Sequence, residues 1–364
     1  MFPLLANAAI RKKWVPQWIS SIILCYGVGI LIANLRPWPI DKELMEGVAG
    51  GGMLIGLPLL LFSVRIQDFR RYGGRMLTSF LLCCLAGVLC TGATAYLLRS
   101  SQSDGWQLAG MLTGLYTGGT PNVQAIGIAL DAPPEYVVLI QAADVLLGGS
   151  YLIGLLTFLP VLYGKIFTPT PAGPAGSTVS DIGVDVPSFR QRAIQLMWSV
   201  SVVLASLLLC RIFTGAWFAP TGLILSVTTL SILFTLTPLA RRIGNAYPLG
   251  EYFVLVFCVA LGMLADFRQL AAEGMDLLLF SAVALASTTC LHLVLAKVFR
   301  IDRDTVILSS VAAFYGPVFV VQVAAAIRNT RLLAAGVAVS LLGFGIGNYL
   351  GIGLAYALRW AIYG

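Results

Sequence analysis

The chain has 364 residues, of which 58% are hydrophobic and only 11% are charged, with a formal net charge of +7. A soluble domain would carry roughly a quarter charged residues, so this composition excludes a soluble globular protein and indicates a polytopic membrane protein. The basic residues lie between apolar segments, where cytoplasmic flanks and anionic headgroups account for them, so we expect a lipid bilayer and no nucleic acid as a partner.

About eleven apolar segments follow one another along the chain, and each is uniformly rather than alternately apolar. This pattern predicts transmembrane helices and argues against an outer-membrane barrel, whose strands alternate. No cleavable signal peptide is evident, and Arg11, Lys12 and Lys13 precede the first segment, which predicts a cytoplasmic amino terminus. The predicted spans are residues 18–35, 44–63, 76–98, 106–130, 135–163, 192–213, 217–239, 249–266, 275–298, 305–327 and 332–360.

The order of the segments repeats weakly along the chain. A span ends in Asp-Phe-Arg at 68–70 and another at 266–268, and a proline, Pro121 or Pro317, interrupts a later span at a similar distance from each. We therefore predict an all-α fold of 10–11 transmembrane helices in two five-helix repeats. The first repeat would cover residues 1–164, a Pro/Gly/Ser-rich linker 165–190, and an extra span with the second repeat 191–364.

Loop charges favour an inverted arrangement of the two repeats. Four basic residues place the loop after the second span in the cytoplasm: Arg65, Arg70, Arg71 and Arg75. Strict alternation through eleven spans would put a second basic set outside, whereas inversion would put it inside: Arg241, Arg242, Lys297, Arg300 and Arg303. Inversion requires that one apolar segment does not cross or that one span is missing from the count, and the sequence leaves this conflict open.

Two short stretches with helix-breaking residues interrupt apolar segments. The first is Tyr116-Thr117-Gly118-Gly119-Thr120-Pro121-Asn122, with a break predicted at 117–122, and the second is Ala312-Ala313-Phe314-Tyr315-Gly316-Pro317, with a break at 313–317. Peptide groups freed inside hydrocarbon cost several kcal/mol each, so such backbone is tolerated mainly where protein or a cavity surrounds it. Two breaks in matching places favour the midplane binding site of a transporter.

The first break is the more polar of the two. An amino-terminal helix end there would attract a carboxylate-bearing solute, whereas a carboxyl-terminal end with hydroxyl and amide oxygens would suit Na⁺, and both possibilities stay open. Close helix packing at the glycines is the structural alternative. The candidate solute- or ion-binding residues of this break are Thr117, Gly118, Gly119, Thr120, Pro121, Asn122 and Gln124.

The second break offers fewer polar groups. In the last span, glycines between 343 and 351 favour a close packing face, although Asn348 within them could still close the cavity. The candidate residues of this half are Ser310, Tyr315, Gly316, Pro317, Gln322 and Asn348.

Asp144 is the sharpest single candidate, because it is a carboxylate in the middle of a predicted span, one turn after Gln141, which we also include in the site. Such a carboxylate costs at least ~2.5 kcal/mol at the bilayer centre. Burial disfavours its charged form, so Asp144 is predicted to couple protons or orient a ligand. A protonated Asp144 bound to a broken-helix N–H is the structural alternative. The only histidine, His292, has no acidic or cysteine neighbours, so we expect a core histidine and no metal site.

These motifs resemble the signature of the domain-of-unknown-function 819 family of bacterial and plant membrane proteins. The residues of the first break, followed by Ala125, Ala129-Leu130 and Ala143-Asp144, look like its first signature. Its carboxyl-terminal signature looks like Ser310, Gly316-Pro317 and residues 343–351.

The family is similar in architecture to the cation:proton antiporter and anion transporter superfamily. The resemblance implies two interrupted, crossing helices in inverted repeats, a core domain that carries the site, and a scaffold domain that often forms a homodimer. Where the second signature usually has asparagines and Gly-Gly-Pro, this chain has Val311, Ala313 and Tyr315. The first break and Asp144 would then carry most of the polar contacts.

Together these features predict a secondary active transporter of a small anionic or zwitterionic organic solute in the bacterial inner membrane. We expect coupling to H⁺ or Na⁺, with a preference for H⁺, and no cofactor. A channel or facilitative export pore is the alternative, although pores line themselves with rings of like groups. A membrane-embedded enzyme acting on a lipid-linked substrate is the second alternative. We expect no enzyme and no catalytic residues, because the sequence lacks a phosphate loop, a Ser/His/Asp set and an HExxH motif.

Overall fold

The computed structural model describes residues 2–11, 21–35, 41–62, 74–99, 104–170, 188–264, 267–327 and 329–363. Throughout these ranges the regular structure is helical, without strands, which confirms the prediction of an all-α polytopic membrane protein. Seven helices have the length and composition to cross a bilayer. They are α3 (Lys42–Leu61), α5 (Gly74–Leu97), α8 (Pro134–Leu156), α10 (Phe189–Thr214), α12 (Tyr247–Leu264), α13 (Phe267–Val298) and α16 (Leu333–Leu358).

The remaining predicted spans correspond to shorter or interrupted helices. Two of them are single helices, α2 (Ser21–Leu35) and α11 (Pro220–Thr235). Two are interrupted pairs: α6 (Gly105–Gly118) with α7 (Thr120–Ala129), and α14 (Arg303–Phe314) with α15 (Pro317–Ala326). The structure adds helices α1 (Phe2–Arg11) and α9 (Leu159–Ile166), which the sequence analysis did not separate from their surroundings. It also has two short 3₁₀ helices, η2 (Ala240–Arg242) and η3 (Thr330–Leu332), and a π-helix, η4 (Arg359–Tyr363).

Several predictions fall on residues outside the described ranges. They concern Asp68, Asp266, Lys12, Lys13, Arg65, Arg70, Arg71 and residues 171–187 of the predicted linker.

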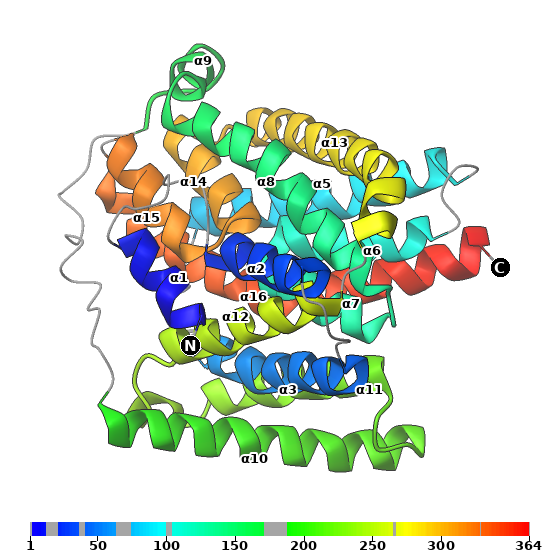
Figure 1. The fold of residues 1–364 in the computed structure, drawn as a ribbon. Helices are drawn as coiled ribbons and strands as arrows, with labels where there is room; N and C mark the ends of the chain where they lie inside the picture. Colours follow the sequence, from blue (N-terminus) through cyan, green and yellow to red (C-terminus); the bar gives the residue numbers. More distant parts are fainter. Residues whose placement is uncertain are drawn as a thin grey trace. The chain divides into compact units, whose positions relative to one another are not determined.

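The outer faces of several helices are apolar, as hydrocarbon requires. Leu81, Leu85 and Leu89 of α5 are exposed at four-residue intervals, which places them on one face of that helix. The long helix α10 (green in Figure 1) exposes leucines in the same way along its length. Large apolar stripes of this kind are unfavourable against water and suit contact with lipid tails.

The helices form two compact units. Unit 1 contains residues 1–63, 124–146 and 187–281, and unit 2 contains residues 64–123, 147–186 and 282–364. Helix α8 therefore begins in unit 1 and passes into unit 2 after Leu146. Each unit draws residues from both predicted halves of the chain, so the repeat organisation, which stays a prediction, does not coincide with the division into units.

Unit 1 is built around α12, which packs against both α2 and α3. Small residues allow these approaches: a Cβ on Gly29 of α2 would lie 2.9 Å from the Cα of Gly262 in α12, and a Cβ on Gly56 of α3 would lie 3.2 Å from the carbonyl oxygen of Gly250. Helices in lipid gain stability mainly by such close packing, since burial of apolar side chains gains little there.

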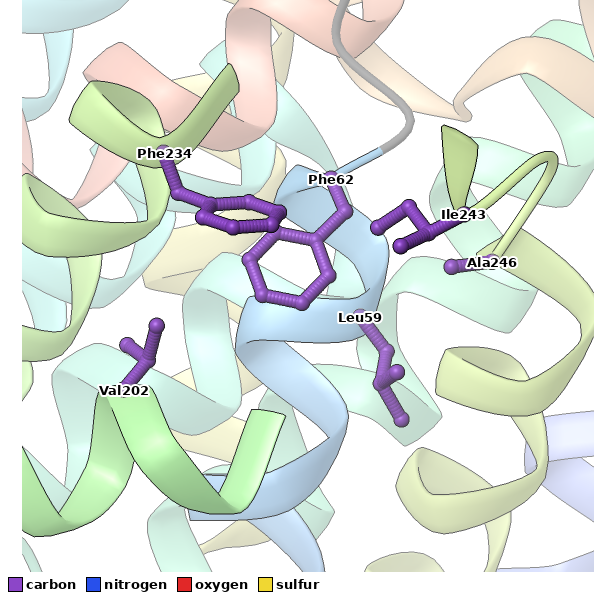
Figure 2. Packing of buried hydrophobic residues seen from close by; sticks show 6 residues of the cluster. All are labelled: Leu59, Phe62, Val202, Phe234, Ile243 and Ala246. Carbon is purple, nitrogen blue, oxygen red and sulfur yellow. The ribbon is translucent and has the colours of Figure 1, made fainter. Parts of the chain in front are cut away.

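The end of α3 contributes to an aromatic cluster in unit 1. The rings of Phe62 and Phe234 lie 4.7 Å apart, centroid to centroid, and Val202 and Ile243 pack around them (Figure 2). A hydrogen bond stabilises the same region, because the side-chain amide of Gln195 donates to the carbonyl of Ile243 over 2.8 Å.

In unit 2, helix α16 runs antiparallel to α6. The ring of Trp106, at the start of α6, lies 6.3 Å from that of Tyr356 near the end of α16, while Gly118 at the end of α6 lies against Gly343. A buried polar cluster joins α5, α13 and α14: the Oγ atoms of Ser79 and Ser309 lie 2.7 Å apart, and Nε2 of His292 lies 3.3 Å from Ser79 Oγ. His292 is therefore a hydrogen-bonded core residue.

The second interrupted segment does not cross unit 2. Nδ2 of Asn329, just after α15, donates to Oδ2 of Asp304 in the first turn of α14 over 2.7 Å. A continuous helix would separate these residues by about 37 Å, at about 1.5 Å per residue. Helices α14 and α15, drawn in orange in Figure 1, thus form a re-entrant hairpin with its tip at Tyr315 and Gly316.

The hairpin gathers basic residues at one end of unit 2. Arg75 and Arg331 line one cavity with the start of α14, where the N–H of Arg303 donates to the carbonyl of Thr168 over 3.1 Å. Lys297, at the end of α13, donates to the carbonyl of Ile166 close by. Because residues 305–327 follow all five basic residues of the second set, this return does not by itself change the face on which that set lies, and the inverted arrangement stays a prediction.

We expect Gly29→Ala to lower the melting temperature of the purified protein, because the new methyl group would meet the carbonyl oxygen of Val259 and the backbone of Gly262. Overpacking of this kind costs about 1–3 kcal/mol. Gly27→Ala on the same helix is the matched control, since a Cβ there meets nothing within 4 Å and alanine favours helix. Thermal unfolding followed by tryptophan fluorescence checks both variants, and an equal loss in the two would contradict this packing.

We expect Arg75→Cys and Arg331→Cys to react with a membrane-impermeant maleimide from the same face of oriented vesicles, because α15 returns to the end where α14 begins. Arg99→Cys, at the far end of α5, should react from the opposite face. The unmodified chain is the control, since six of its cysteines are buried and the exposed Cys290 lies within α13. If Arg331→Cys and Arg75→Cys react from different faces, α14 and α15 span the bilayer after all.

Candidate functional site

The breaks of the two interrupted helices lie against each other within unit 2. A Cβ placed on Gly119 would lie 3.5 Å from the carbonyl oxygen of Phe314 and 3.9 Å from the backbone nitrogen of Gly316. The rings of Tyr116 and Phe314, one on each helix, are 5.3 Å apart. The sequence-predicted breaks at 117–122 and 313–317 are therefore one structural feature.

This meeting point lies level with the middle of a spanning helix. A Cβ on Gly87, near the centre of α5, would lie 3.5 Å from Cβ of Tyr116, and the hydroxyls of Thr91 and Thr113 are 2.6 Å apart. Helix α5 is long enough to cross a bilayer. The point where the two breaks meet consequently lies near the depth of the midpoint of α5 in the bilayer.

Glycines make both breaks possible. Gly119 has a φ of 76° and Gly316 a φ of 88°, a region that costs other residues about 1–2 kcal/mol. Helices α6 and α14 end there, so unpaired carbonyls with partial negative charge gather on one side of each break. Helices α7 and α15 begin there, and their first N–H groups supply partial positive charge.

Asn122 ties the first break to α16. Its Nδ2 donates to the carbonyls of Phe344 over 3.2 Å and of Gly343 over 3.4 Å, while its amide group rests against Gly347. A Cβ on Gly118 would lie 2.6 Å from Oδ1 of Asn122. This oxygen is buried and has no hydrogen-bond partner among the described residues, so an acceptor remains beside the break.

Ser340 is a site residue that the sequence analysis missed. Its buried Oγ lies 4.0 Å from the position of a Cβ on Gly316 and has no hydrogen-bond partner in the described part of the chain. It precedes Gly343 by one helical turn in α16, so its spacing from the packing glycines was the available signal. Asn348, two turns further along α16, is buried.

The other predicted residues of the two breaks occupy varied surroundings. The hydroxyl of Thr117 donates to the carbonyl of Thr113 in its own helix over 2.7 Å, and that of Ser310 donates to the carbonyl of Ile307 over 2.9 Å. Tyr315 Oη donates to the carbonyl of Gly148 over 2.7 Å. Thr120, Pro121 and Pro317 are half-buried, and Gln322 is exposed on α15.

Gln124, Gln141 and Asp144 belong to unit 1, whereas both breaks belong to unit 2, and each unit is described by itself. Gln124 is buried, with its Nε2 3.2 Å from Sγ of Cys258 and 3.4 Å from Oη of Tyr26. Gln141 is buried and Asp144 is half-buried in α8. A shared role of Asp144 and the breaks therefore stays a prediction.

Glu251 is a second carboxylate inside a span that the sequence analysis missed. It lies in the second turn of α12 and is half-buried, also in unit 1. Its position near the end of an apolar run concealed it, because an acidic residue there is usually an interfacial anchor.

Comparison with known proteins assigns the chain to a family. A family model described as "Protein of unknown function (DUF819)" matches residues 4–361. The chain belongs to the DUF819 family. It is also 25% identical over 363 residues to a Bacillus subtilis (strain 168) protein described as "Uncharacterized membrane protein YjcL", and the match covers 94% of this chain and 90% of that relative.

The family assignment confirms the resemblance that the two broken-helix motifs indicated. Because the DUF819 model covers nearly the whole chain, both breaks, α8 and α16 lie inside the matched region. The similarity to YjcL agrees with the apolar helices in identifying a membrane protein.

We expect Gly119→Ala to destabilise the protein by about 1–2 kcal/mol, because alanine is strained at a φ of 76° and its methyl group would approach the carbonyl of Phe314. The measurement is the melting temperature in detergent. Gly149→Ala, in α8, serves as the control, since a Cβ there meets nothing within 4 Å. A melting temperature of Gly119→Ala equal to that of the control would show that the break needs no left-handed residue.

Proposed function

We propose that this protein is a secondary active transporter of a small anionic or zwitterionic organic solute. The observation that carries the proposal is the meeting of two interrupted helices near mid-depth of unit 2, where Gly119 lies against Phe314 and Gly316. Unwound backbone at membrane depth recurs at the binding sites of secondary transporters, since it supplies peptide groups of both signs to solutes and ions.

The groups at the crossing suit such a solute. The first N–H groups of α7 and α15 favour a carboxylate, as anions generally bind at helix amino termini. Oδ1 of Asn122 and Oγ of Ser340 are buried acceptors without described partners, and they favour a proton donor or a cation. A solute with one anionic group and one donor, or an anion together with a coupling ion, would satisfy both sets.

We assign the coupling role to Asp144 and favour H⁺ over Na⁺. Asp144 is a carboxylate in the middle of α8, where a permanent charge is costly and reversible protonation relieves that cost. It has no hydrogen bond or ion pair to another residue that the structure describes, so its carboxyl group is available for exchange.

We further propose that the basic end of unit 2 faces the cytoplasm of a bacterium. Arg75, Lys297, Arg303 and Arg331 gather there, and short loops with Lys and Arg remain on the cytoplasmic side. We also propose a cytoplasmic amino terminus, which the basic residues 11–13 before α2 favour by the same rule. Transport would use movement of unit 2, which holds both breaks, relative to unit 1. A homodimer would form through the scaffold domain that the family resemblance implies.

A thermal-shift screen of small carboxylates and amino acids, at two pH values with and without Na⁺, would identify the solute. A ligand at 100 times its Kd stabilises the folded state by about 2.7 kcal/mol. Counterflow in proteoliposomes then separates a carrier from a pore, since only a carrier exchanges labelled for unlabelled solute against a gradient. Flux that never saturates, without counterflow, would refute the transporter and favour the pore.

We expect Asp144→Asn to abolish pH-driven uptake of the identified solute, because an amide cannot release a proton. Uptake into proteoliposomes with an imposed pH gradient, with internal pH followed by a trapped dye, is the measurement. Asp131→Asn is the matched control, since Asp131 is an exposed turn residue whose φ of 52° asparagine tolerates. Unchanged uptake by Asp144→Asn would remove Asp144 from the mechanism.

A further inference from the structure

A cavity of about 240 Å³ lies at the basic end of unit 2, apart from the crossing of the broken helices. Tyr315 follows Thr305, which lines this cavity, by ten residues of α14, or about 15 Å of helix. The polar residues of the lining come from four separate segments of the chain and are Arg75, Thr170, Asp302, Thr305, Asn329 and Arg331.

The carboxylate in this lining is already satisfied. Oδ2 of Asp302 accepts the hydroxyl of Thr170 over 3.0 Å and the N–H of Thr305 over 3.1 Å, and Oδ1 accepts the hydroxyl of Thr305 over 2.9 Å. Asp302 is thus the amino-terminal cap of α14, where the helix dipole also favours its charge. It holds the cavity wall together.

Asn329 supplies an acceptor that has no partner. Its side chain is 8% exposed, and its Nδ2 donates to Oδ2 of Asp304, whose Oδ1 forms an ion pair with Nε of Arg303 over 2.7 Å. These bonds define which amide atom is the donor, since the carboxylate can only accept. Oδ1 of Asn329 therefore remains buried and without a partner among the described residues, in a side chain that lines the cavity.

Positive charge completes the lining. Arg75 lies in the first turn of α5 and Arg331 in η3, so among the lining residues that the structure describes two guanidinium groups from distant segments accompany the fully bonded carboxylate of Asp302. Guanidinium groups bind carboxylates and phosphates through paired hydrogen bonds. The buried oxygen of Asn329 adds a requirement for a hydrogen-bond donor in the same ligand.

We propose that this cavity is a binding site for a small anion that carries a hydroxyl group. The anionic group binds Arg75 and Arg331, and the hydroxyl donates to Oδ1 of Asn329. This chemistry is found in free hydroxycarboxylates and also in the phosphate and glycerol of a phosphatidylglycerol headgroup. The site is distinct from the crossing of the broken helices, and its existence does not depend on transport.

Isothermal titration calorimetry of the full-length protein in a neutral detergent tests the site with L-malate and succinate. These dicarboxylates differ by one hydroxyl group, so we expect malate to bind about tenfold more tightly, because succinate leaves the buried oxygen of Asn329 unpaired. Equal affinities for the two acids would overturn the assignment of the hydroxyl to Asn329.

Charge variants test the anionic half of the site. Arg331→Gln and, separately, Arg75→Gln should each weaken malate binding about tenfold, as loss of a charge-assisted hydrogen bond does. The Arg75 side chain is exposed, so its replacement leaves the fold intact even if Arg331 also supports η3. Arg359→Gln is the control, since Arg359 lies 4.9 Å from the ring of Trp106 at the opposite end of the unit. Full affinity in both cavity variants would refute the site.

Lipid composition distinguishes the two sources of the ligand. In nanodiscs of phosphatidylcholine, the affinity for malate should equal that in detergent, and adding phosphatidylglycerol should leave it unchanged if a free hydroxycarboxylate is the natural ligand. Weaker malate binding with phosphatidylglycerol, abolished by Arg75→Gln, would assign the site to the headgroup. Asp131→Asn, at an exposed turn, should keep full malate affinity, and because this binding is measured without transport, failure of the transport proposal would leave the result standing.

Discussion

The structure of unit 2 depends on how peptide groups at mid-membrane depth find partners. Two helices stop there, and the hydrocarbon around them offers no hydrogen bonds, so every carbonyl and N–H released by the breaks must be met by protein, water or a ligand. The chain meets this demand by bringing the breaks together: Gly119 lies against Phe314 and Gly316, and Asn122 bonds the carbonyls of Gly343 and Phe344 in α16. Each break is thus enclosed by the other and by one glycine-rich helix.

The need to enclose the broken backbone explains the glycines of α16. Gly343 touches the carbonyl of Thr117, and Gly347 touches the amide of Asn122, so a larger side chain at either position would push α16 away from the break. In a soluble protein such small residues would mainly forfeit buried apolar area, but in lipid they allow the close contacts on which helix association depends. The glycine run that the sequence indicated as a packing face is therefore also the wall of the candidate site.

Local signals predicted the breaks well, and non-local contacts escaped prediction. Proline weakens a helix and glycine tolerates a positive φ, so Pro121, Pro317 and the adjacent glycines marked the positions of both interruptions in the sequence. The return of α15 could not be read in this way, because residues 305–327 are long and apolar enough to span, and the hairpin is revealed by the bond between Asp304 and Asn329, which are far apart in the sequence.

The missed site residues have the same explanation. Ser340 is an ordinary serine in an apolar helix until Gly316 is placed beside it, and the cavity residues are ordinary loop residues until four segments converge.

The hairpin also connects the site to the charge pattern. If α14 and α15 together spanned the membrane, Arg331 would lie on the face opposite Arg75. The basic loops of the chain would then divide between the two faces of the membrane. Because the segment turns back at Tyr315 and Gly316, the positive-φ junction at Gly316 that contributes to the crossing also returns Arg331 to the end that holds Arg75 and Arg303. A break at mid-depth and a common basic face are therefore consequences of one feature, and a change that straightened the second break would disturb the candidate site and the orientation of the chain together.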